Sequence, residues 1–307
     1  MKKLLVLLKT DPDRWVRLLQ TALPEHAILT SASGAGDIAY ALVSTPPPGA
    51  IQGIAGLQAV FSVNAGIEAL LESSEVPAGV PIVRMVDDGM AEGMLEWVLA
   101  TTLAWHRNLF AYRSLQAAKY WEPMQEILAR NRRVTVLGAG HLGGRAAAML
   151  AQLGFRTRTW SRTAKQIPGV TSFFGPDRLD ESLGGSDILI NLLPLTPATE
   201  NLLDRRLLSL LAPAAVLING GRGRHVVDQA VIELLDSGQL RAAVLDVFRE
   251  EPLPGTHSFW SHPGVYVTPH VAAPTHAGTA VAAIADNIMG FEAGAPLRHV
   301  VDLKRGY

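Results

Sequence analysis

The sequence has 307 residues and contains no cysteine. This absence excludes disulfide bonds, thiolate catalysis, and zinc or iron–sulfur sites held by cysteine. It also fits a reducing compartment, and we expect the protein to work in the cytoplasm. An excess of charge of one sign is missing as well, because the formal net charge is −1. The chain therefore lacks the basic surface that is typical of nucleic-acid binding, and we expect no nucleic-acid partner.

Long hydrophobic runs are also absent. No stretch approaches the roughly 20 consecutive apolar residues that a membrane-spanning helix requires, so we expect no membrane span. The apolar run Leu4–Leu8 is shorter than the core of a secretory signal peptide, and no small-residue cleavage site follows it. We interpret this run as a first buried strand. A chain of 307 residues is too long for one compact core and indicates two domains.

Strand-like and helix-like segments alternate along the chain, which is typical of parallel, doubly wound sheets. In the first part we expect strands at Leu4–Leu8, Ala27–Thr30, Ala39–Val43, Ala59–Val63 and Pro81–Val86, with helices at Arg14–Leu23 and Ile67–Glu72. A long helix from Ala91 to about Leu109 then crosses between the domains. The second part has apolar strands at Val134–Leu137, Arg156–Trp160, Ile188–Leu192, Ala215–Asn219, Ala243–Val247 and Val265–Thr268, with helices at Arg145–Leu153, Arg205–Leu211 and Gln229–Ser237. A last helix runs from Thr279 to about Ala293, and the polar tail Val300–Tyr307 returns to the first domain.

A glycine-rich turn follows the apolar strand that ends at Leu137. Gly138, Gly140 and Gly143 supply the pattern G-x-G-x-x-G, and a helix-forming segment comes directly after it. In this context the glycines allow a tight turn and close backbone approach, and the helix N-terminus offers N–H groups to a pyrophosphate. Glycines recur in many loops, so the flanking strand and helix carry the prediction. We predict a dinucleotide-binding loop made of Gly138, Gly140, His141, Leu142 and Gly143.

Acidic residues are missing where an NAD site usually has one. Between Ala139 and Pro176 there is no aspartate or glutamate to accept hydrogen bonds from the ribose 2′-hydroxyl. Instead Ser161, Arg162 and Lys165 follow the next strand, and cations and hydroxyls suit a 2′-phosphate. We therefore predict NADP(H) as the cofactor. NAD(H) is the less favoured alternative, because the two cations could also be solvated loop charges.

Three reactive side chains, Arg222, Glu251 and His270, each come shortly after a predicted strand. Ligands of an open α/β sheet bind beyond the carboxyl ends of its strands, so this trio is expected at one edge of the sheet. Each residue also has an ordinary explanation. The histidine could be a packed loop residue, Glu250 could take the place of its neighbour, and Arg224 could take the place of Arg222.

This trio suits the reduction of a carbonyl group. A carbonyl that receives a hydride needs a proton at its oxygen, and histidine has an ordinary pKa close to neutral. A carboxylate beside it raises the pKa of the imidazolium and orients the ring. Arginine can bind a substrate carboxylate through two hydrogen bonds and polarise the carbonyl. We therefore predict His270 as the general acid, Glu251 as its partner and Arg222 as the clamp for the substrate.

Over nearly its whole length the chain resembles the D-isomer-specific 2-hydroxyacid dehydrogenases. The segments that carry the resemblance are Leu137–Gly143, Asn191–Thr196, Asn219–Gly223, Leu245–Pro252 and Thr268–Ala272. The resemblance implies that Arg222, Glu251 and His270 are the catalytic residues and that Asp246 holds the nicotinamide carboxamide. Further cofactor contacts are expected at Leu193, Pro194, Gly220, Arg222 and His270.

Within the family, the chain most resembles the branch of NADPH-dependent glyoxylate/hydroxypyruvate reductases, type A. This likeness is carried by Arg84–Met90, Thr159–Arg162, Ile190–Pro194, Val226–Asp228, Ala272–Ala273 and the ending Arg305–Tyr307. It implies reduction of glyoxylate or hydroxypyruvate to glycolate or D-glycerate, with the substrate held by Arg222, His270 and the backbone of Asn64, Ala65 and Gly66. Asn64 itself and the stretch Ser44–Pro48, where a tryptophan-bearing loop is expected, depart from the pattern of the branch.

We accordingly predict an α/β protein of two domains, each a doubly wound parallel sheet: a Rossmann nucleotide domain and a smaller flavodoxin-like substrate domain. The substrate domain is placed at residues 1–95 plus 280–307 and the dinucleotide-binding domain at 96–279. Members of the family are usually homodimers, and the resemblance places the contact on the long helix from Ala91, although its apolar residues also suit a core helix. Two other functions stay open: another D-2-hydroxyacid dehydrogenase activity, with a different 2-oxo acid or with NAD, and a non-enzymatic dinucleotide sensor.

Overall fold

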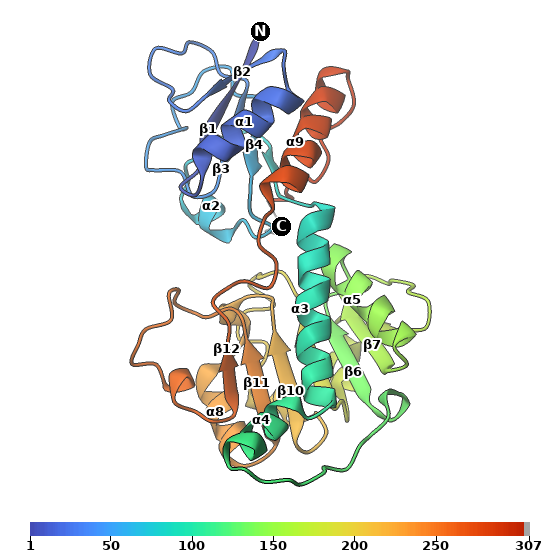
Figure 1. Ribbon diagram of the computed structural model, residues 1–307. Coiled ribbons are helices and arrows are strands. Elements are labelled where there is room, and N and C mark those ends of the chain that lie inside the picture. The colour runs from blue at the N-terminus through green and yellow to red at the C-terminus, as the bar shows by residue number, and fades with distance from the viewer. Residues whose placement is uncertain (304–307) are drawn as a thin grey trace. The chain divides into compact units, whose positions relative to one another are not determined.

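The computed structural model describes residues 1–303 (Figure 1). The chain forms two compact units, Met1–Met90 together with the chain from Thr275 onward, and Ala91–Pro274. Each unit contains one sheet, and all strands in both sheets run parallel. The predicted α/β fold class with two parallel sheets is thereby confirmed.

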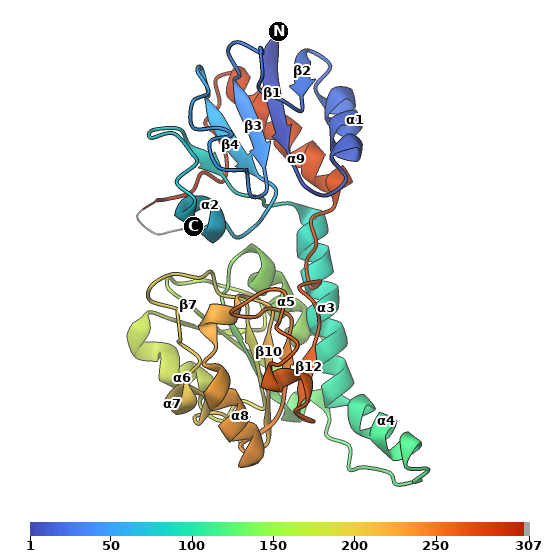
Figure 2. The same ribbon diagram turned by 90° about the vertical axis from the view of Figure 1, so that its left-hand side faces the viewer.

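The first unit has a five-stranded sheet in the order β2-β1-β3-β4-β5, which is the strand order of flavodoxin-like folds. Its elements are β1 (Lys2–Leu7), α1 (Pro12–Ala22), β2 (His26–Leu29), β3 (Tyr40–Val43), β4 (Ala59–Ser62), α2 (Glu68–Glu72), β5 (Ile82–Val83) and α9 (Ala277–Glu292). Strands β3 and β4 are buried along their whole length, as expected of parallel strands covered on both faces. Helices α1 and α9, far apart in the sequence, pack against each other beside the sheet (Figure 2).

The C-terminal tail returns to the first unit, as its sequence predicted. Val300 forms an antiparallel bridge with Val83 of the edge strand β5. The N–H of Val301 donates to the carbonyl oxygen of Ile82 at 2.8 Å, and the Val301 side chain is buried. Residues 304–307, which include the motif at the chain end, lie outside the described residues.

The second unit has a seven-stranded sheet in the order β12-β11-β10-β9-β6-β7-β8. Counted from β6, this is the Rossmann order with one further strand, and the order reverses between β6 and β9. Ligands of such sheets bind at the carboxyl ends of the strands beside this reversal. The strands are β6 (Arg133–Leu137), β7 (Arg156–Ser161), β8 (Thr171–Phe174), β9 (Ile188–Asn191), β10 (Ala215–Asn219), β11 (Leu240–Leu245) and β12 (Val265–Val267). The helices are α3 (Asp88–His106), α4 (Leu109–Ala117), α5 (His141–Gln152), α6 (Leu179–Leu183), α7 (Arg205–Leu208) and α8 (Asp228–Asp236), with 3₁₀ turns η1 (Ala129–Asn131), η2 (Pro176–Arg178), η3 (Gly223–His225) and η4 (Ser258–Trp260).

Both faces of the seven-stranded sheet are buried, which explains its near-continuous apolar strands. Successive side chains of a strand point to opposite faces, so Val136 of β6 belongs to one apolar core and Leu137 to the other. The long helix α3 packs on the first of these cores through Met94, Val98 and Trp105. These three residues of α3 therefore belong to the core of this unit.

Several elements depart from the sequence predictions. The strand predicted at Pro81–Val86 is only β5 (Ile82–Val83), and the helix predicted at Arg205–Leu211 ends at Leu208. The edge strand β8 was not predicted, because two of its four side chains are exposed and no continuous apolar run marks it. Helix α6 was not predicted either, because five residues are too few to show a helical period. The long helix ends at His106 rather than near Leu109, because Asn108 has a left-handed φ of 57°, and α4 follows as a separate helix. None of the described helices is long and apolar enough to span a membrane.

Candidate active site

The glycine turn lies between the central strand β6 and helix α5. Gly138 has a φ of +96°, and a Cβ there would come within 2.6 Å of the carbonyl oxygen of Leu192. A Cβ on Gly143 would lie 1.8 Å from the carbonyl oxygen of Gly138, so α5 can approach the turn this closely only without a side chain. A Cβ on Gly140, by contrast, would meet no atom within 4 Å. The turn is therefore closed on the protein side and open at Gly140, which is the shape that a pyrophosphate requires.

Helix α5 begins directly at this turn. Gly140 is its N-cap and supplies no side-chain hydrogen bond to the helix. His141 is exposed and Leu142 is half-buried in the first turn. No side-chain hydrogen bond caps this end, and the positive end of the dipole of this 12-residue helix points toward the turn, where it favours an anion.

The residues predicted to recognise the ribose follow β7, the strand beside β6. A hydrogen bond links the glycine turn to β7, because the N–H of Gly138 donates to the carbonyl oxygen of Trp160 at 2.8 Å. Ser161 ends β7, and its hydroxyl donates to a carbonyl oxygen of the following loop at 2.8 Å. Arg162 and Lys165 are exposed in the same loop. The loop thus presents cations and a hydroxyl, and no carboxylate, beside the glycine turn.

The other predicted cofactor contacts follow β9 and β10 at the same edge of the sheet. Leu193 is buried and Pro194 is half-buried in the segment after β9. Gly220 follows β10, and a Cβ on it would come within 3.1 Å of the Trp97 ring of α3. The loops after β6, β7, β9 and β10 therefore gather the predicted nucleotide residues at the carboxyl edge of one sheet.

His270 and Glu251 form a close pair at this edge. His270 Nδ1 lies 2.7 Å from Glu251 Oε2, and Glu251 Oε1 accepts a hydrogen bond from the Phe248 N–H at 2.9 Å. His270 has a left-handed φ of 53°, which is uncommon for a residue with a side chain and concentrates at functional sites. The carboxylate accepts a hydrogen bond from a protonated Nδ1, and Nε2 is the ring nitrogen that does not face Glu251.

The buried carboxylate of Asp246 holds the loop that carries His270. Asp246 is 1% exposed. Its Oδ1 accepts hydrogen bonds from the Thr268 hydroxyl at 2.6 Å and the Val271 N–H at 2.9 Å, and its Oδ2 accepts from the Ala272 N–H at 2.9 Å. The loop is thus fixed on both sides of His270, which explains how the left-handed backbone of that residue is maintained.

The charges of the pair stabilise each other. The hydrogen bond to Glu251 raises the pKa of His270 above its ordinary value, against the opposing effect of burial. Burial alone would raise the pKa of Glu251, but the hydrogen bonds from His270 and from the Phe248 N–H outweigh it, so the pKa of this carboxyl is lowered. The pair therefore favours an imidazolium beside a carboxylate, which is the form able to give a proton.

Arg222 stands at the start of the turn η3, directly after β10. Its guanidinium Nη1 donates to the carbonyl oxygen of Gly221 at 2.7 Å. A Cβ on Gly223 would lie 1.9 Å from the carbonyl carbon of Phe248. The backbone of the Arg222 turn is therefore in direct contact with the loop that carries Glu251.

The structure separates the neighbours that the sequence left as alternatives. Arg224 forms an ion pair with Glu200, whose Oε1 lies 2.9 Å from its Nη2. Glu250 is exposed, and the contact to His270 comes from Glu251. Glu251 is thus the one of the two neighbouring glutamates that pairs with His270, and Arg224 is paired with Glu200.

The predicted substrate loop belongs to the first unit, in the bend after β4. Asn64 is exposed there, with Ala65 and Gly66 half-buried beside it. The N–H of Asn64 donates to the hydroxyl of Ser62 at 3.0 Å, so this one of the three N–H groups is bound within its own loop. The departing stretch Ser44–Pro48 lies in the loop after β3. Both loops follow the carboxyl ends of neighbouring strands.

Three fully buried polar residues behind Arg222 were not among the predicted site residues. Asn191, Asn219 and His225 each have 0% exposure. Asn191 Nδ2 contacts both Asn219 Oδ1 and His225 Nδ1 at 2.9 Å. The sequence holds a signal for the two asparagines, because each of them ends an otherwise apolar strand.

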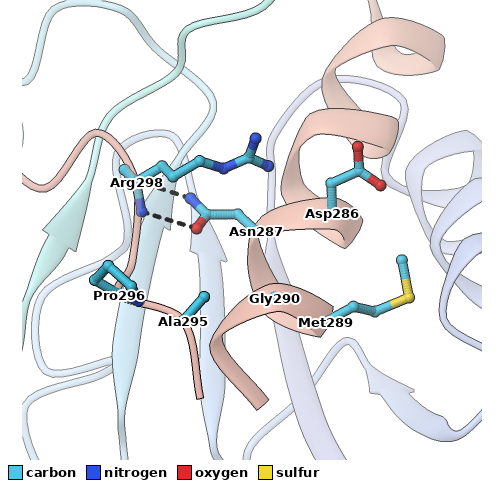
Figure 3. A pocket seen from close by; sticks show the side chains of 7 residues that line it. All are labelled: Asp286, Asn287, Met289, Gly290, Ala295, Pro296 and Arg298. Carbon is cyan, nitrogen blue, oxygen red and sulfur yellow. Dashed lines mark hydrogen bonds between the residues drawn. The ribbon is translucent and has the colours of Figure 1, made fainter. Parts of the chain in front are cut away.

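A separate groove in the first unit lies beside α9, and Figure 3 shows it from close by. The buried amide of Asn287 forms two hydrogen bonds of 3.0 Å with the backbone N–H and carbonyl of Arg298, tying that segment to α9 (Figure 3). The lining consists of Asp286, Asn287, Met289, Gly290, Ala295, Pro296 and Arg298. None of the predicted site residues lines this groove.

Comparison with known proteins identifies the family. The sequence model of the D-isomer specific 2-hydroxyacid dehydrogenase NAD binding domain matches residues 99–272, more than half of the chain. The chain belongs to this family. This 2-hydroxyacid dehydrogenase is 42% identical to the glyoxylate/hydroxypyruvate reductase A of Yersinia enterocolitica and 42% identical to that of Photorhabdus laumondii. Each match covers 97% of this chain and 97% of the relative.

Solved structures similar to this 2-hydroxyacid dehydrogenase cover it completely. An NADPH-dependent glyoxylate/hydroxypyruvate reductase from Sinorhizobium meliloti, in complex with NADP and sulfate, has a TM-score of 0.94 at 36% identity, over 100% of both chains. A D-isomer specific 2-hydroxyacid dehydrogenase from Xanthobacter autotrophicus, in complex with NADPH and MES, has a TM-score of 0.95 at 37% identity, over 100% of this chain and 99% of the other.

Proposed function

We propose that the protein is an NADPH-dependent reductase of small 2-oxo acids, which converts glyoxylate to glycolate and hydroxypyruvate to D-glycerate. The observation that carries this proposal is the 2.7 Å contact between His270 Nδ1 and Glu251 Oε2 at the sheet edge that also holds Arg222 and the glycine turn. A proton donor, an anion-binding cation and a dinucleotide-binding turn are the parts that this reaction needs. The names of the relatives indicate the same reaction.

Each catalytic side chain has a separate task. NADPH, when bound, supplies the hydride to the carbonyl carbon of the substrate. His270 gives a proton from Nε2 to the carbonyl oxygen as negative charge develops there, and Glu251 orients the ring and stabilises its charged form. Arg222 binds the substrate carboxylate and polarises the carbonyl. One hydride and one proton are added, and in the reverse direction neutral His270 takes the proton back.

The nucleotide-binding residues fit NADPH better than NADH. The open side of the turn at Gly140 and the uncapped start of α5 suit the pyrophosphate. Ser161, Arg162 and Lys165 would hold the 2′-phosphate, since the loop offers cations and no carboxylate. The proposed contacts to the rest of the cofactor are Gly138, His141, Leu142, Gly143, Leu193, Pro194, Gly220, Arg222, Asp246 and His270.

The first unit is proposed as the substrate domain and the second as the dinucleotide-binding domain. In the first unit, the bend after β4 carries the proposed substrate-binding residues Asn64, Ala65 and Gly66. The N–H of Asn64 is bound by Ser62, so the N–H groups of Ala65 and Gly66 are the ones proposed to bind the substrate carboxylate. A different 2-oxo acid is the second candidate, and the observation that favours it is the pair of departures at Asn64 and Ser44–Pro48. These residues lie in loops after two neighbouring strands, where they would select the side chain of the substrate.

The experiment that tests the function follows the loss of NADPH absorbance with glyoxylate, hydroxypyruvate and pyruvate, each with NADPH and with NADH. Fast oxidation of NADPH with the first two acids is the expected result. A His270→Ala variant should keep its dissociation constant for NADPH and lose most of its turnover, because only proton transfer is removed. Turnover with NADH alone would contradict the cofactor assignment. Tight NADPH binding without turnover of any acid would favour a different substrate or a sensor.

We also propose that the protein is a homodimer. Apolar side chains are exposed on α4 and the segment after it, including Trp121 at 98% exposure, and this part of the unit stands out in Figure 2. The exposed set consists of Leu109, Tyr120, Trp121, Ile127 and Leu128. Such a set is typical of an interface, and a second copy is the partner that family membership suggests. Light scattering should show a dimer that Trp121→Ser weakens and that the control Trp260→Ser, on a separate exposed tryptophan, leaves intact; a wild-type monomer would contradict the proposal.

The proposed place of action is the cytoplasm. A chain without cysteine cannot form the disulfide bonds that are typical of proteins in oxidising compartments, which fits a reducing one. Fractionation of cells that produce the tagged protein checks this, and recovery of the protein outside the cytoplasmic fraction would contradict it.

A further inference from the structure

Two asparagines end neighbouring strands of the second unit without any exposed surface. Asn191 is the last residue of β9 and Asn219 the last residue of β10, and they are partners in the strand register. Buried amides need hydrogen-bond partners, because an unpaired one costs about 1–3 kcal/mol. Asn191 Nδ2 donates to Asn219 Oδ1 at 2.9 Å, and Asn191 Oδ1 accepts from the Leu193 N–H at 3.3 Å. The third member of the cluster is His225, which is equally buried.

The partners of His225 fix where its proton lies. Nδ1 receives hydrogen bonds from the backbone N–H of Arg222 at 3.1 Å and from Asn191 Nδ2 at 2.9 Å. Nε2 lies 3.2 Å from the carbonyl oxygen of Pro194. A backbone N–H can only donate and a carbonyl can only accept, so Nδ1 is unprotonated and Nε2 carries the hydrogen. His225 is therefore a neutral ring in one tautomer, which differs from the charged pair formed by His270.

This cluster, and not the sheet, holds the backbone of Arg222. Its N–H is taken by His225 Nδ1, and its carbonyl oxygen accepts from Asn219 Nδ2 at 3.1 Å. The preceding residue is held as well, since the Gly221 N–H donates to Asn219 Oδ1 at 3.2 Å. A Cβ on Gly221 would come within 2.9 Å of Asn191 Nδ2 and 3.1 Å of His225 Nδ1. The turn that presents Arg222 is thus pressed directly onto the buried cluster.

We propose that Asn191, Asn219 and His225 are positioning residues for Arg222, which set the place of its guanidinium and hence the affinity for the carboxylate of a 2-oxo acid. This inference rests on the proposed function, in which Arg222 binds that carboxylate. A fully satisfied buried network is rigid, and a displacement of about 1 Å at a binding group can cost on the order of 100-fold in rate. His225 carries the decisive contact, because its Nδ1 is the acceptor for the Arg222 N–H.

Two substitutions of His225 distinguish the roles of its two ring nitrogens. In His225→Asn, an amide oxygen near the place of Nδ1 keeps an acceptor for Arg222, and the hydrogen bond to Pro194 is lost. In His225→Gln, an amide nitrogen near the place of Nε2 keeps the donor to Pro194, and the acceptor opposite Arg222 is lost. We expect kcat/KM for glyoxylate to fall roughly 30-fold or more in His225→Gln, mainly through KM, and to stay within about 3-fold in His225→Asn. The dissociation constant for NADPH should change much less than KM does in His225→Gln, because most of the proposed NADPH contacts lie in the loops after β6 and β7, away from His225. Equal losses in both variants, in parallel with loss of thermal stability, would show a merely structural residue and overturn the inference.

The same substitution in a protein that lacks the Arg222 side chain tests whether His225 acts through Arg222. In an Arg222→Ala protein, His225→Gln should cause no further loss of kcat/KM, because the residue through which it acts is gone. A further loss as large as in the wild type would overturn the inference. An Arg222→Ala variant with unchanged kcat/KM would instead show that the proposed role of Arg222 is wrong, which keeps the two failures apart.

A measurement without substrate or cofactor checks the ring itself. Nitrogen NMR of histidine-labelled protein, with His225 assigned by the signal missing in His225→Asn, should show an unprotonated Nδ1 and a protonated Nε2 between about pH 6 and pH 8. The opposite tautomer, or an imidazolium, would contradict the hydrogen bonds on which the inference stands.

Discussion

At the scale of single residues, the chemistry depends on how the surroundings of His270 change its protonation. Glu251 raises the pKa of His270, and in the proposed reaction the charged form of His270 is the proton donor. The rate of reduction should therefore fall as the pH rises through this raised pKa. In Glu251→Gln, the pKa of His270 should return toward its ordinary value of about 6.5, and the fall in kcat/KM should move to lower pH.

The pH profiles of kcat/KM for wild type, Glu251→Gln and Glu250→Gln check this prediction. The neighbour Glu250 is exposed and should leave the profile in place. A profile that does not move in Glu251→Gln, or that moves to higher pH, would mean that the 2.7 Å contact does not control the proton of His270.

Arg162 gives the second prediction at this scale. If its cation holds the 2′-phosphate of NADPH, then Arg162→Ala should raise the dissociation constant for NADPH by roughly 10-fold or more. This is in line with the loss of one charge-assisted hydrogen bond of about 1.5–3 kcal/mol. NADH lacks that phosphate, so its dissociation constant should stay nearly unchanged. Fluorescence titration with both nucleotides measures the difference, and an equal loss for both would show that Arg162 does not recognise the phosphate.

At the scale of elements, the glycine turn shows what a sequence pattern can and cannot establish. The strand β6, the turn and α5 are local in sequence, so the apolar run and the glycine spacing predicted them together. The cluster behind Arg222 escaped prediction because Asn191 and His225 are far apart in the chain and meet only through the register of β9 beside β10. Strand β8 escaped for a different reason, since an edge strand needs no apolar run.

The turn itself yields a prediction from two glycines with opposite surroundings. A Cβ on Gly143 would lie 1.8 Å from a backbone oxygen, and a Cβ on Gly140 would meet nothing within 4 Å. Gly143→Ala should therefore force α5 away from the turn. We expect it to lower the free energy of unfolding by about 3 kcal/mol and to weaken the binding of NADPH. Gly140→Ala should keep the stability of the wild type and weaken only the binding of NADPH, because the new methyl group points into the space proposed for the pyrophosphate.

Thermal unfolding and NADPH titration of both variants separate the two cases. Loss of stability in Gly140→Ala, or none in Gly143→Ala, would contradict the packing of this turn. Unchanged NADPH affinity in Gly140→Ala would show that the open side of the turn is not the place of the pyrophosphate.

At the scale of the whole molecule, the two units differ in how the chain builds them. The first unit needs both the start and the end of the chain, whereas the second is one continuous segment with its own apolar cores. A protein that starts at Asp87, whose Oδ1 accepts a hydrogen bond from the Met90 N–H at the start of α3, and that ends at Pro274 should therefore fold alone. It contains every proposed NADPH contact and lacks Asn64, Ala65 and Gly66.

We expect this segment to show a cooperative unfolding transition and to bind NADPH within about 3-fold of the full chain, because its nucleotide contacts are all local to it. Its kcat/KM for glyoxylate should fall by roughly 100-fold or more, since the proposed substrate-binding residues of the first unit are missing. Circular dichroism, NADPH titration and the reductase assay measure the three quantities. Full turnover by the segment would show that the first unit is not the substrate domain, and a folded segment that fails to bind NADPH would place part of the nucleotide site outside residues 87–274. Only the combination of retained binding and lost turnover assigns the cofactor to one unit and the choice of substrate to the other.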